Sequence, residues 1–326
     1  MKFDAPQFKT EEAARAYIEA LRWPNGVRVC GKCGTVGGDY PTKRPGRYRC
    51  GQKECRKDFT VMTGTVMEAS HIKLNVWLMA FYLMASSKKG MSAHQLHRSL
   101  DITYKSAWFL AHRIRLAMAN GGLLAGPIGG PGKVVEADET YYGKVETPTT
   151  VRADGRPYNR GFSGKGNYRG VANKRAIIAL VERGGQARVF HVAEATKKTV
   201  AKIIDENVDR RSRLHTDESL LYPQVGKSFA SHETVHHKAG EYARGDVTTN
   251  NAEGFFGVFK KGMSGVYQHC SEKHLHRYVG EFEFRFNHRI KLGWSDKARA
   301  DAALVGAEGK RLTYRRTDGA EQHVQA

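Results

Sequence analysis

The chain of 326 residues has few acidic residues, few cysteines and no long hydrophobic run. Its longest apolar run, residues 76–85, is far shorter than the roughly 20 residues that a membrane-spanning helix needs. The first residues, Met1-Lys2-Phe3-Asp4-Ala5-Pro6, contain no apolar core of the kind found in secretory signals. We therefore expect a cytoplasmic protein with no membrane partner.

The shortage of acids leaves a strong positive charge. The chain has 33 Asp and Glu against 53 Lys and Arg, which gives a formal net charge of +20. This excess favours a polyanionic partner, most simply nucleic acid; an anionic membrane surface is the weaker alternative. The length is sufficient for a sizeable core and suggests about two or three domains.

Four of the five cysteines lie within 26 residues, which does not suggest a secreted disulfide framework. They form two pairs, Cys30-x2-Cys33 and Cys50-x4-Cys55. Two such pairs predict one tetrahedral structural Zn²⁺ in a zinc ribbon, whereas four unrelated thiols would rarely pair in this way. Four cysteine ligands leave no open position for catalysis.

The predicted ribbon is itself basic. Residues 28–57 contain nine Lys and Arg against Asp39 and Glu54, with aromatic residues interleaved. This composition suits phosphate contact and base stacking. A merely solvated basic face, or a ribbon that docks on a protein, remains an alternative.

A helical pattern surrounds the ribbon. Thr10 can cap a first helix, which ends before Pro24. An apolar helix from Leu74 precedes a short helix at 93–100 and a longer one at 104–118. This order predicts a helix-turn-helix, although other three-helix bundles share it. The candidate DNA-contacting residues of the longer helix are Lys105, Arg113 and Arg115.

The stretch 134–143 predicts a β-strand that carries acids. Alternation along a strand puts Glu136 and Asp138 on one face and Glu139 on the other. An acid within a β-strand is costly to bury unless a metal or a partner compensates, which makes Asp138 a candidate metal ligand. The structural alternative is an edge strand with a hydrated face.

The following pattern is that of a mixed sheet. A hairpin is predicted at 176–181 and 187–192, a helix at 199–208, and short strands at 213–218 and 234–237. Amphipathic helices follow from Asn250 and at 274–289.

Asp217 at a strand end and Glu253 on a helix could join Asp138 in a site for Mg²⁺, which prefers oxygen ligands. Each acid also has a structural interpretation. Asp138 could occupy a strand-end turn, and Asp217 could cap a helix at 219–221. Glu253 could form a capping box with Asn250.

Several stretches together resemble the DDE-class transposases of bacterial insertion sequences, of the kind that begins with a zinc ribbon. The residues that carry the resemblance are Val135-Glu-Ala-Asp138-Glu-Thr-Tyr-Tyr-Gly143, Thr216-Asp217-Glu218, Asn250-Asn-Ala-Glu253-Gly-Phe-Phe-Gly-Val-Phe-Lys260-Lys-Gly262, Gly265-Val-Tyr267, His274-Leu-His-Arg-Tyr278 and Phe286-Asn-His-Arg289. With the ribbon and the helical region, the similarity covers most of residues 10–290. One departure is Thr248, where relatives have His before Thr-Asn; some relatives also have Asn in place of Glu253.

The resemblance implies an RNase-H-like catalytic domain in which Asp138, Asp217 and Glu253 hold two Mg²⁺ or Mn²⁺ ions. It also implies that Lys260, with its neighbour Lys261, contacts substrate DNA. Glu136 and Asn250 are auxiliary candidates.

The predicted fold class is thus α+β or α/β, with a zinc ribbon, a helix-turn-helix region and an RNase-H-like mixed sheet. The expected domains are an N-terminal helix (1–28), the ribbon (29–66), the helix-turn-helix region (70–120), a linker (121–132), the catalytic domain (133–295) with a basic insertion (146–175), and a tail (296–326).

The expected function is DNA transposition in the bacterial cytoplasm. A water would first release the 3′ end of the element, and the freed 3′-OH would then attack target DNA. The partners are the terminal inverted repeats and target DNA, and we expect at least a dimer, because two ends must be cut together.

Two other functions compete with transposition. One is a non-catalytic DNA-binding regulator built from the ribbon and the helix-turn-helix. The other is a zinc protease, suggested by His232-Glu233-x-x-His236. That motif requires a helix, whereas its sequence favours a strand, so we interpret it as a chance match.

Overall fold

The computed structural model describes residues 3–119, 126–144 and 174–313. Their contacts divide them into two compact units. The ribbon–helix unit contains the described residues of 1–86, 91–118 and 296–326; the sheet unit contains those of 87–90 and 119–295. The predicted basic insertion at 146–175 lies outside the described residues except for its last two positions.

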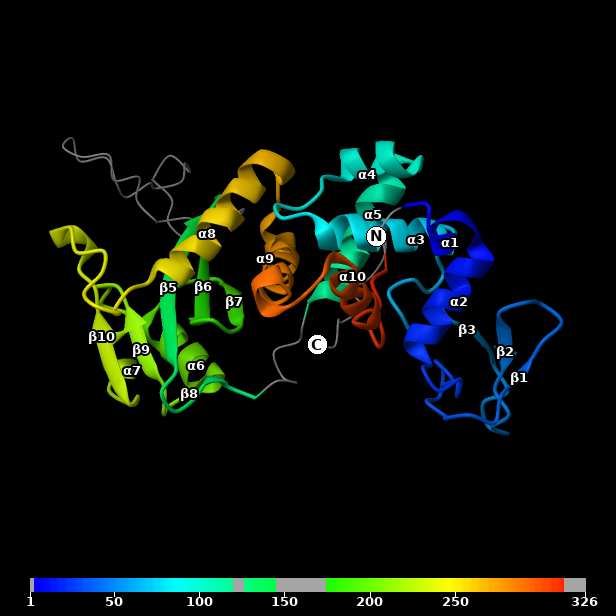
Figure 1. Cartoon of the computed structure of the whole chain (residues 1–326), viewed down its shortest axis with the longest axis horizontal. Coiled ribbons are helices and arrows are strands. Elements are labelled where there is room, and N and C mark those ends of the chain that lie inside the picture. Colours follow the sequence, from blue (N-terminus) through cyan, green and yellow to red (C-terminus); the bar gives the residue numbers. More distant parts are fainter. Residues whose placement is uncertain (1–2, 120–125, 145–173, 314–326) are drawn as a thin grey trace, which may run out of the picture. The chain divides into compact units, whose positions relative to one another are not determined.

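The ribbon–helix unit combines helices with one small sheet (Figure 1). Its helices are α1 (Pro6–Lys9), α2 (Glu11–Arg22), α3 (Leu74–Ser86), α4 (Ala93–Leu100), α5 (Tyr104–Met118) and α10 (Asp296–Val305). The antiparallel sheet of the ribbon consists of β1 (Tyr40–Pro41), β2 (Arg47–Arg49) and β3 (Asp58–Thr60). Phe59 on β3 is buried and packs edge-on against Trp23.

The helix boundaries follow from side-chain caps. Thr10 Oγ1 accepts a hydrogen bond from Ala13 N at 3.2 Å, and Ser92 Oγ accepts one from Gln95 N at 3.1 Å. Thr103 Oγ1 accepts one from Ser106 N at 3.2 Å. These bonds satisfy backbone donors that the first turn leaves unpaired. The predicted bounds of α4 and α5 are confirmed.

The predicted tail after residue 295 instead begins with helix α10. Its buried side chains include Ala300, Ala303 and Leu304 at helical spacing. The guanidinium of Arg299 donates to Ala85 O on α3 at 3.2 Å. Small alanines supply most of the apolar face, so the hydrophobic pattern is weak in the sequence although the helix is packed.

The sheet unit is organised around a five-stranded mixed sheet of order β10-β9-β5-β6-β7. Its strands are β5 (Val134–Tyr142), β6 (Arg175–Glu182), β7 (Ala187–Val192), β9 (Arg213–Thr216) and β10 (Ser231–Thr234). β5, β6 and β7 pair antiparallel, which confirms the predicted hairpin, whereas β9 and β10 run parallel to β5. The last strand lies three residues earlier than predicted.

Helices cover both faces of this sheet (Figure 1). They are α6 (Lys197–Asn207), α7 (Pro223–Gly226), α8 (Asn250–Gly262) and α9 (Glu272–Asn287). Short helical turns follow β10, α8 and α9: η1 (His237–Ala239), η2 (Met263–Tyr267) and η3 (Ile290–Leu292). On one face Ile177 and Ala179 pack with Phe255 and Phe259 of α8. On the other face the strand residues that alternate with them, Ile178 and Leu180, pack with α6 and α7.

Part of the predicted linker belongs to the sheet unit. Residues Ile128–Gly129 form strand β4, which pairs in parallel with β8 (Val208–Asp209). Gly129 N donates to Glu182 Oε2 at 3.0 Å. The sequence does not predict this pair of strands, because two residues are too few to show an alternating pattern and glycines surround them.

Candidate active site and metal centre

The register of the sheet brings Asp138 and Asp217 together. Glu136 on β5 lies opposite His215 on the parallel strand β9. Two residues further along, the same register places Asp217 beside Asp138, just after β9 ends. Residues opposite each other in neighbouring strands point to the same face. On its other side Asp138 is opposite Ala179, which belongs to the core under α8. The register therefore places both carboxylates at the α8 side of the sheet.

The surroundings of Asp138 disfavour its charge. Burial, followed by the negative charges of Glu139, Asp217 and Glu253, raises the pKa of Asp138 to about 8. A hydrogen bond from Glu139 N to Oδ1, at 2.8 Å, offsets these effects only in part. A buried carboxylate that is surrounded by like charges keeps its proton to a higher pH than an ordinary carboxylate, and a bound cation would favour its ionised form. Carboxylate oxygens are the donors that hard divalent cations prefer, although the ligand atoms of Asp138, Asp217 and Glu253 do not all lie within 4.8 Å of one another.

Asp217 has a local structural contact as well. Its Oδ1 accepts a hydrogen bond from Ser219 N at 3.0 Å, which closes a turn at the end of β9. Burial raises the pKa of Asp217 in spite of this bond. The structural alternative, in which Asp217 caps a helix at residues 219–221, is wrong, because the next helix begins only at Pro223. One oxygen holds the turn, and the carboxylate still contributes to the charge cluster.

Glu253 lies in the first turn of α8 and is not part of a capping box. The N-cap residue is Thr249 rather than Asn250, and Asn250 N donates to Thr248 Oγ1 at 3.1 Å. Glu253 Oε1 instead accepts from Thr249 Oγ1 at 3.5 Å and lies 3.2 Å from His237 Nε2. The Glu253 side chain is 46% exposed, so it can meet a ligand from solvent.

His237 is the residue of this site that the sequence analysis missed. It begins the η1 turn after β10, and its backbone N donates to Glu218 Oε2 at 2.8 Å. Its ring Nε2 reaches both Glu253 Oε1 and Thr249 Oγ1, the latter at 3.3 Å. The residue therefore connects the segment after Asp217 to the first turn of α8. A histidine three residues beyond a strand carries no signal of this contact in the sequence.

Glu136 has a more specific place than that of an auxiliary ligand. Its side chain is fully buried, and Oε2 accepts hydrogen bonds from Asn251 N at 2.7 Å and Ala252 N at 3.2 Å. Its Oε1 accepts from Asn251 Nδ2 and from Arg183 Nη2, both at 2.8 Å. An acid at a helix N-terminus satisfies unpaired N–H groups and the helix dipole. Glu136 thus attaches α8, and with it Glu253, to the central strand.

Glu139 faces away from Glu136, as predicted. Its carboxylate accepts hydrogen bonds from Ser219 Oγ at 3.2 Å and from the Tyr222 hydroxyl. Burial is the main cause that raises the pKa of Glu139. The negative charge of Glu139 nevertheless raises the pKa of Asp138, and the charge of Asp217 raises the pKa of Glu139.

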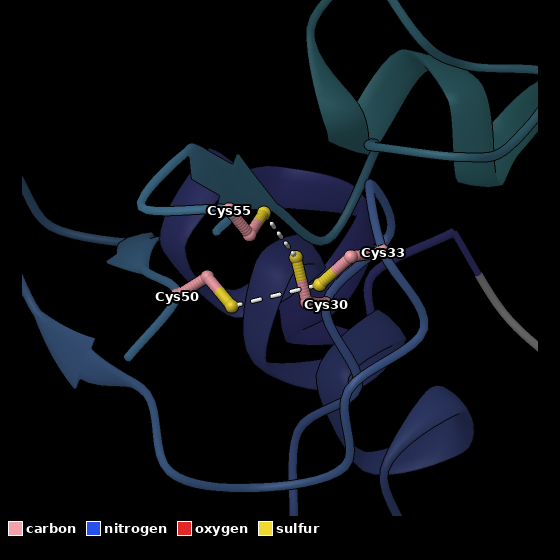
Figure 2. Close-up of side chains that lie close together, drawn as sticks. All are labelled: Cys30, Cys33, Cys50 and Cys55. Carbon is pink, nitrogen blue, oxygen red and sulfur yellow. Dashed lines mark hydrogen bonds between the residues drawn. The ribbon is translucent and has the colours of Figure 1, made fainter. Parts of the chain in front are cut away.

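The four predicted zinc ligands converge (Figure 2). The Sγ atoms of Cys30 and Cys55 are 3.9 Å apart, and those of Cys33 and Cys50 are 3.7 Å apart. Four sulfurs at about 2.3 Å from a tetrahedral zinc would be about 3.8 Å from one another. Within the described ranges, this is the only set of three or more Cys, His, Asp and Glu residues whose ligand atoms all lie within 4.8 Å of each other. It forms a possible zinc site.

Comparison with known proteins identifies a transposase domain and a zinc ribbon. Residues 128–287 match the family described as ISXO2-like transposase domain, and residues 9–58 match the transposase zinc-ribbon domain. The chain belongs to the ISXO2-like transposases. A similar relative is an uncharacterised protein in transposable element ISH50 of Halobacterium salinarum, which is 28% identical over 85% of this chain and 91% of its own length.

The transposase and ribbon matches imply that this transposase binds DNA, but two of its predicted contact residues are not accessible. Arg113 and Arg115 are only 8% and 2% exposed. Arg113 donates to Leu312 O at 3.2 Å and to Glu68 O at 3.1 Å, so it holds the unit together. Lys105 in the first turn of α5 is exposed, as are Lys260 and Lys261 at the end of α8.

The protease motif of the transposase is not a metal site. His232 and Glu233 lie on β10, where they point to opposite faces. His232 Nε2 lies 2.9 Å from Thr216 Oγ1, and Glu233 forms an ion pair of 2.7 Å with Arg213. His236 lies beyond the strand and is exposed. The interpretation as a chance match is confirmed.

In the described parts of the transposase, no helix has both the length and the apolar character needed to cross a membrane.

Proposed function

We propose that this transposase is a DDE-class enzyme whose sheet unit has an RNase-H-like fold and holds two Mg²⁺ or Mn²⁺ ions through Asp138, Asp217 and Glu253. The observation that carries the proposal is the parallel register of β5 and β9, which, continued two residues past Glu136 and His215, puts Asp217 beside Asp138 just after β9 ends. Glu253 contributes to the same electrostatic cluster from the first turn of α8. Mixed strand directions with the first acid on the central strand support the fold assignment.

The residues around the acids prepare them for cation binding. Glu136 fixes the start of α8, and His237 fixes the carboxylate of Glu253. When bound, two divalent ions would activate the attacking oxygen and stabilise the leaving oxygen of a phosphodiester. The chain itself would place the scissile phosphate, with exposed Lys260 and Lys261 on α8 contacting the DNA backbone.

The proposed reaction has two steps. Water attacks the phosphodiester at the end of the element, so that the P–O bond to the 3′ oxygen breaks and a 3′-OH is released. This 3′-OH then attacks a phosphodiester of target DNA, and the target's own 3′ oxygen leaves. The number of phosphodiester bonds is unchanged in the second step, so it needs no external energy source. At least two copies of the chain would act on the two ends.

Cleavage of a labelled terminal-repeat duplex tests the proposal. We expect wild-type nicking in Mg²⁺, and a loss of at least about a hundredfold in Asp138→Asn and Asp217→Asn, since each removes a charged ligand. Lys202→Ala, an exposed change on α6, is the control and should cleave normally. DNA binding without Mg²⁺-dependent nicking by the wild-type protein would instead identify a non-catalytic regulator.

A further inference from the structure

The zinc ribbon contains a hollow with a basic lining. The hollow has a volume of about 410 Å³ and opens to solvent at the sheet of β1, β2 and β3. Most of its charged lining is cationic, and Asp58 is its one acid. Its lining includes Tyr40, Lys43, Arg44, Arg47, Arg49 and Asp58.

The cations of the hollow are held in place by their surroundings. Asp58 forms ion pairs with Arg49 at 2.7 Å and with Arg47 at 3.7 Å. Arg49 is the main cause of the lowered pKa of Asp58, so this carboxylate remains charged and orients both guanidinium groups. A pre-oriented guanidinium loses less entropy when it binds a phosphate and can form two parallel hydrogen bonds with it.

The turn between β1 and β2 is fixed as well. Thr42 N donates to Arg47 O at 2.9 Å, and Arg47 N donates to Arg44 O at 3.2 Å. Gly46 has a φ of +73°, and a Cβ at this position would lie 2.3 Å from Arg15 Cδ of α2. Lys43 and Arg44 are exposed at this turn. Among the described residues, no acidic side chain forms an ion pair with either of them, so their charges are available to a ligand.

We infer that this hollow binds the phosphate backbone of DNA, so that the ribbon is a nucleic-acid contact rather than a protein-docking module. Lys43, Arg44, Arg47 and Arg49 against Asp58 leave a net charge of +3. A surplus of fixed cations in a concave site matches consecutive phosphates, whereas an acidic peptide would have to offer several carboxylates at the same spacing. Tyr40 is 43% exposed at the rim, where it offers a ring to a sugar or an unpaired base.

The contacts of the hollow carry no sequence information. Phosphate contacts fix register and orientation, whereas base edges determine specificity. The ribbon therefore contributes affinity for any duplex, and the preference for the terminal repeat comes from other residues. This inference rests on the proposed function only for the choice of the DNA probe.

Fluorescence anisotropy with a labelled terminal-repeat duplex, in Mg²⁺-free buffer over a range of salt concentrations, tests the inference. For Lys43→Ala/Arg44→Ala in the full chain, we expect the slope of log K against log salt to become shallower by about 2, because each lost phosphate contact contributes about 0.9. The affinity should fall equally for the repeat and for a scrambled duplex.

The matched control is Lys197→Ala/Lys198→Ala, which removes the same charge from the exposed first turn of α6. Its slope should equal that of the wild type. Zinc content and thermal unfolding show whether the ribbon variant is folded. If it is not, the single change Lys43→Ala should make the slope of log K against log salt shallower by about 1.

An unchanged slope in the folded ribbon variant would overturn the inference. Altered self-association in analytical ultracentrifugation, with unchanged DNA affinity, would show that the hollow binds a second copy of the chain instead. Because binding is measured without Mg²⁺, a failure of cleavage in wild-type protein would refute the proposed function and leave this result unaffected.

Discussion

The carboxylate of Glu136 accepts a hydrogen bond from the backbone nitrogen of Asn251, 2.7 Å away, and so attaches the start of α8 to the central strand. Arg183 Nη2 donates to the same carboxylate at 2.8 Å. Because Glu253 lies two residues after Asn251, the position of the third acid depends on this buried contact. Glu136 acts through the fold, whereas Asp138 on the same face lies in the charge cluster.

Glu136→Ala should therefore destabilise the protein. It leaves N–H groups of α8 and the guanidinium of Arg183 without their shared partner, which typically costs about 3 kcal/mol in free energy of unfolding. Urea denaturation measures this change. Glu206→Ala, which removes an exposed acid from α6, should change stability by less than about 0.5 kcal/mol. Equal unfolding midpoints for Glu136→Ala and the wild type would contradict the role of Glu136.

The raised pKa of Asp138 predicts a pH-dependent stability. Its folded-state pKa of about 8 lies above the ordinary 3.8, so the folded state favours the proton. The stabilising contribution is complete below pH 4 and is lost as the pH rises through about 8. In Mg²⁺-free buffer, the melting temperature of the wild type should thus fall between pH 6 and pH 8 more steeply than that of Asp138→Asn.

Added Mg²⁺ should reverse this loss, because a bound cation favours the ionised carboxylate. The stabilisation by Mg²⁺ should accordingly be larger at pH 8 than at pH 6, and it should be absent in Asp138→Asn. Thermal melting at both pH values, with Mg²⁺ from zero to several times its binding constant, measures the effect. Equal stabilisation at the two pH values would show that Asp138 does not titrate in this range.

His237 should affect cation binding through Glu253, whose Oε1 lies 3.2 Å from its Nε2. Losing a residue that orients a metal ligand commonly costs about 10- to 100-fold in metal affinity or activity. We expect such a loss of Mn²⁺ affinity in His237→Ala, measured by electron paramagnetic resonance, and partial recovery in His237→Gln, whose amide can still donate. His236→Ala changes the neighbouring exposed histidine and should bind Mn²⁺ as the wild type does. A normal affinity in His237→Ala would exclude the positioning role.

Features that depend on a few neighbouring residues were predictable from the sequence, whereas features that depend on strand register or on packing were not. The cap at Thr10 acts within one turn, so the local pattern identified it. The paired cysteines identified the ribbon in the same way. The contact between His237 and Glu253 depends on how η1 meets α8, and no local pattern encodes it.

Charge in particular is a poor guide to exposure. Arg113 lies on the predicted recognition helix, and its charge favoured a DNA contact, yet its guanidinium donates to two backbone carbonyls inside the ribbon–helix unit. The sequence could not show this, because one of these carbonyls belongs to Leu312, 199 positions away. Glu136 is likewise an auxiliary candidate on the basis of strand alternation, which identifies the face but not the partner.

Arg113 and Lys105 should consequently differ in what their loss changes. Arg113→Ala removes a buried side chain and both of its hydrogen bonds, and should lower the free energy of unfolding by about 2–4 kcal/mol. Lys105→Ala changes an exposed residue in the first turn of α5, where recognition helices meet DNA, and should weaken DNA binding with unfolding unchanged. Urea denaturation and anisotropy separate the two outcomes. A stable Arg113→Ala variant with weakened DNA binding would restore the original assignment of Arg113.

Loss of the zinc site should disorder the strands that form the basic hollow of the ribbon. Cys50 directly follows β2, and its N donates to Lys57 O at 3.1 Å, next to Asp58 on β3. Cys50→Ser should reduce bound zinc from one per chain to near zero, since a structural site depends on its full set of thiolates. DNA affinity should fall with it, because the ribbon strands that hold Arg49 and Asp58 in register lose their cross-link. Cys270→Ser is the matched control, as this fifth cysteine lies on the sheet unit and outside the sulfur cluster. Zinc measured by mass spectrometry in both variants decides the point: retention of zinc in Cys50→Ser, or its loss in Cys270→Ser, would contradict the assigned ligands.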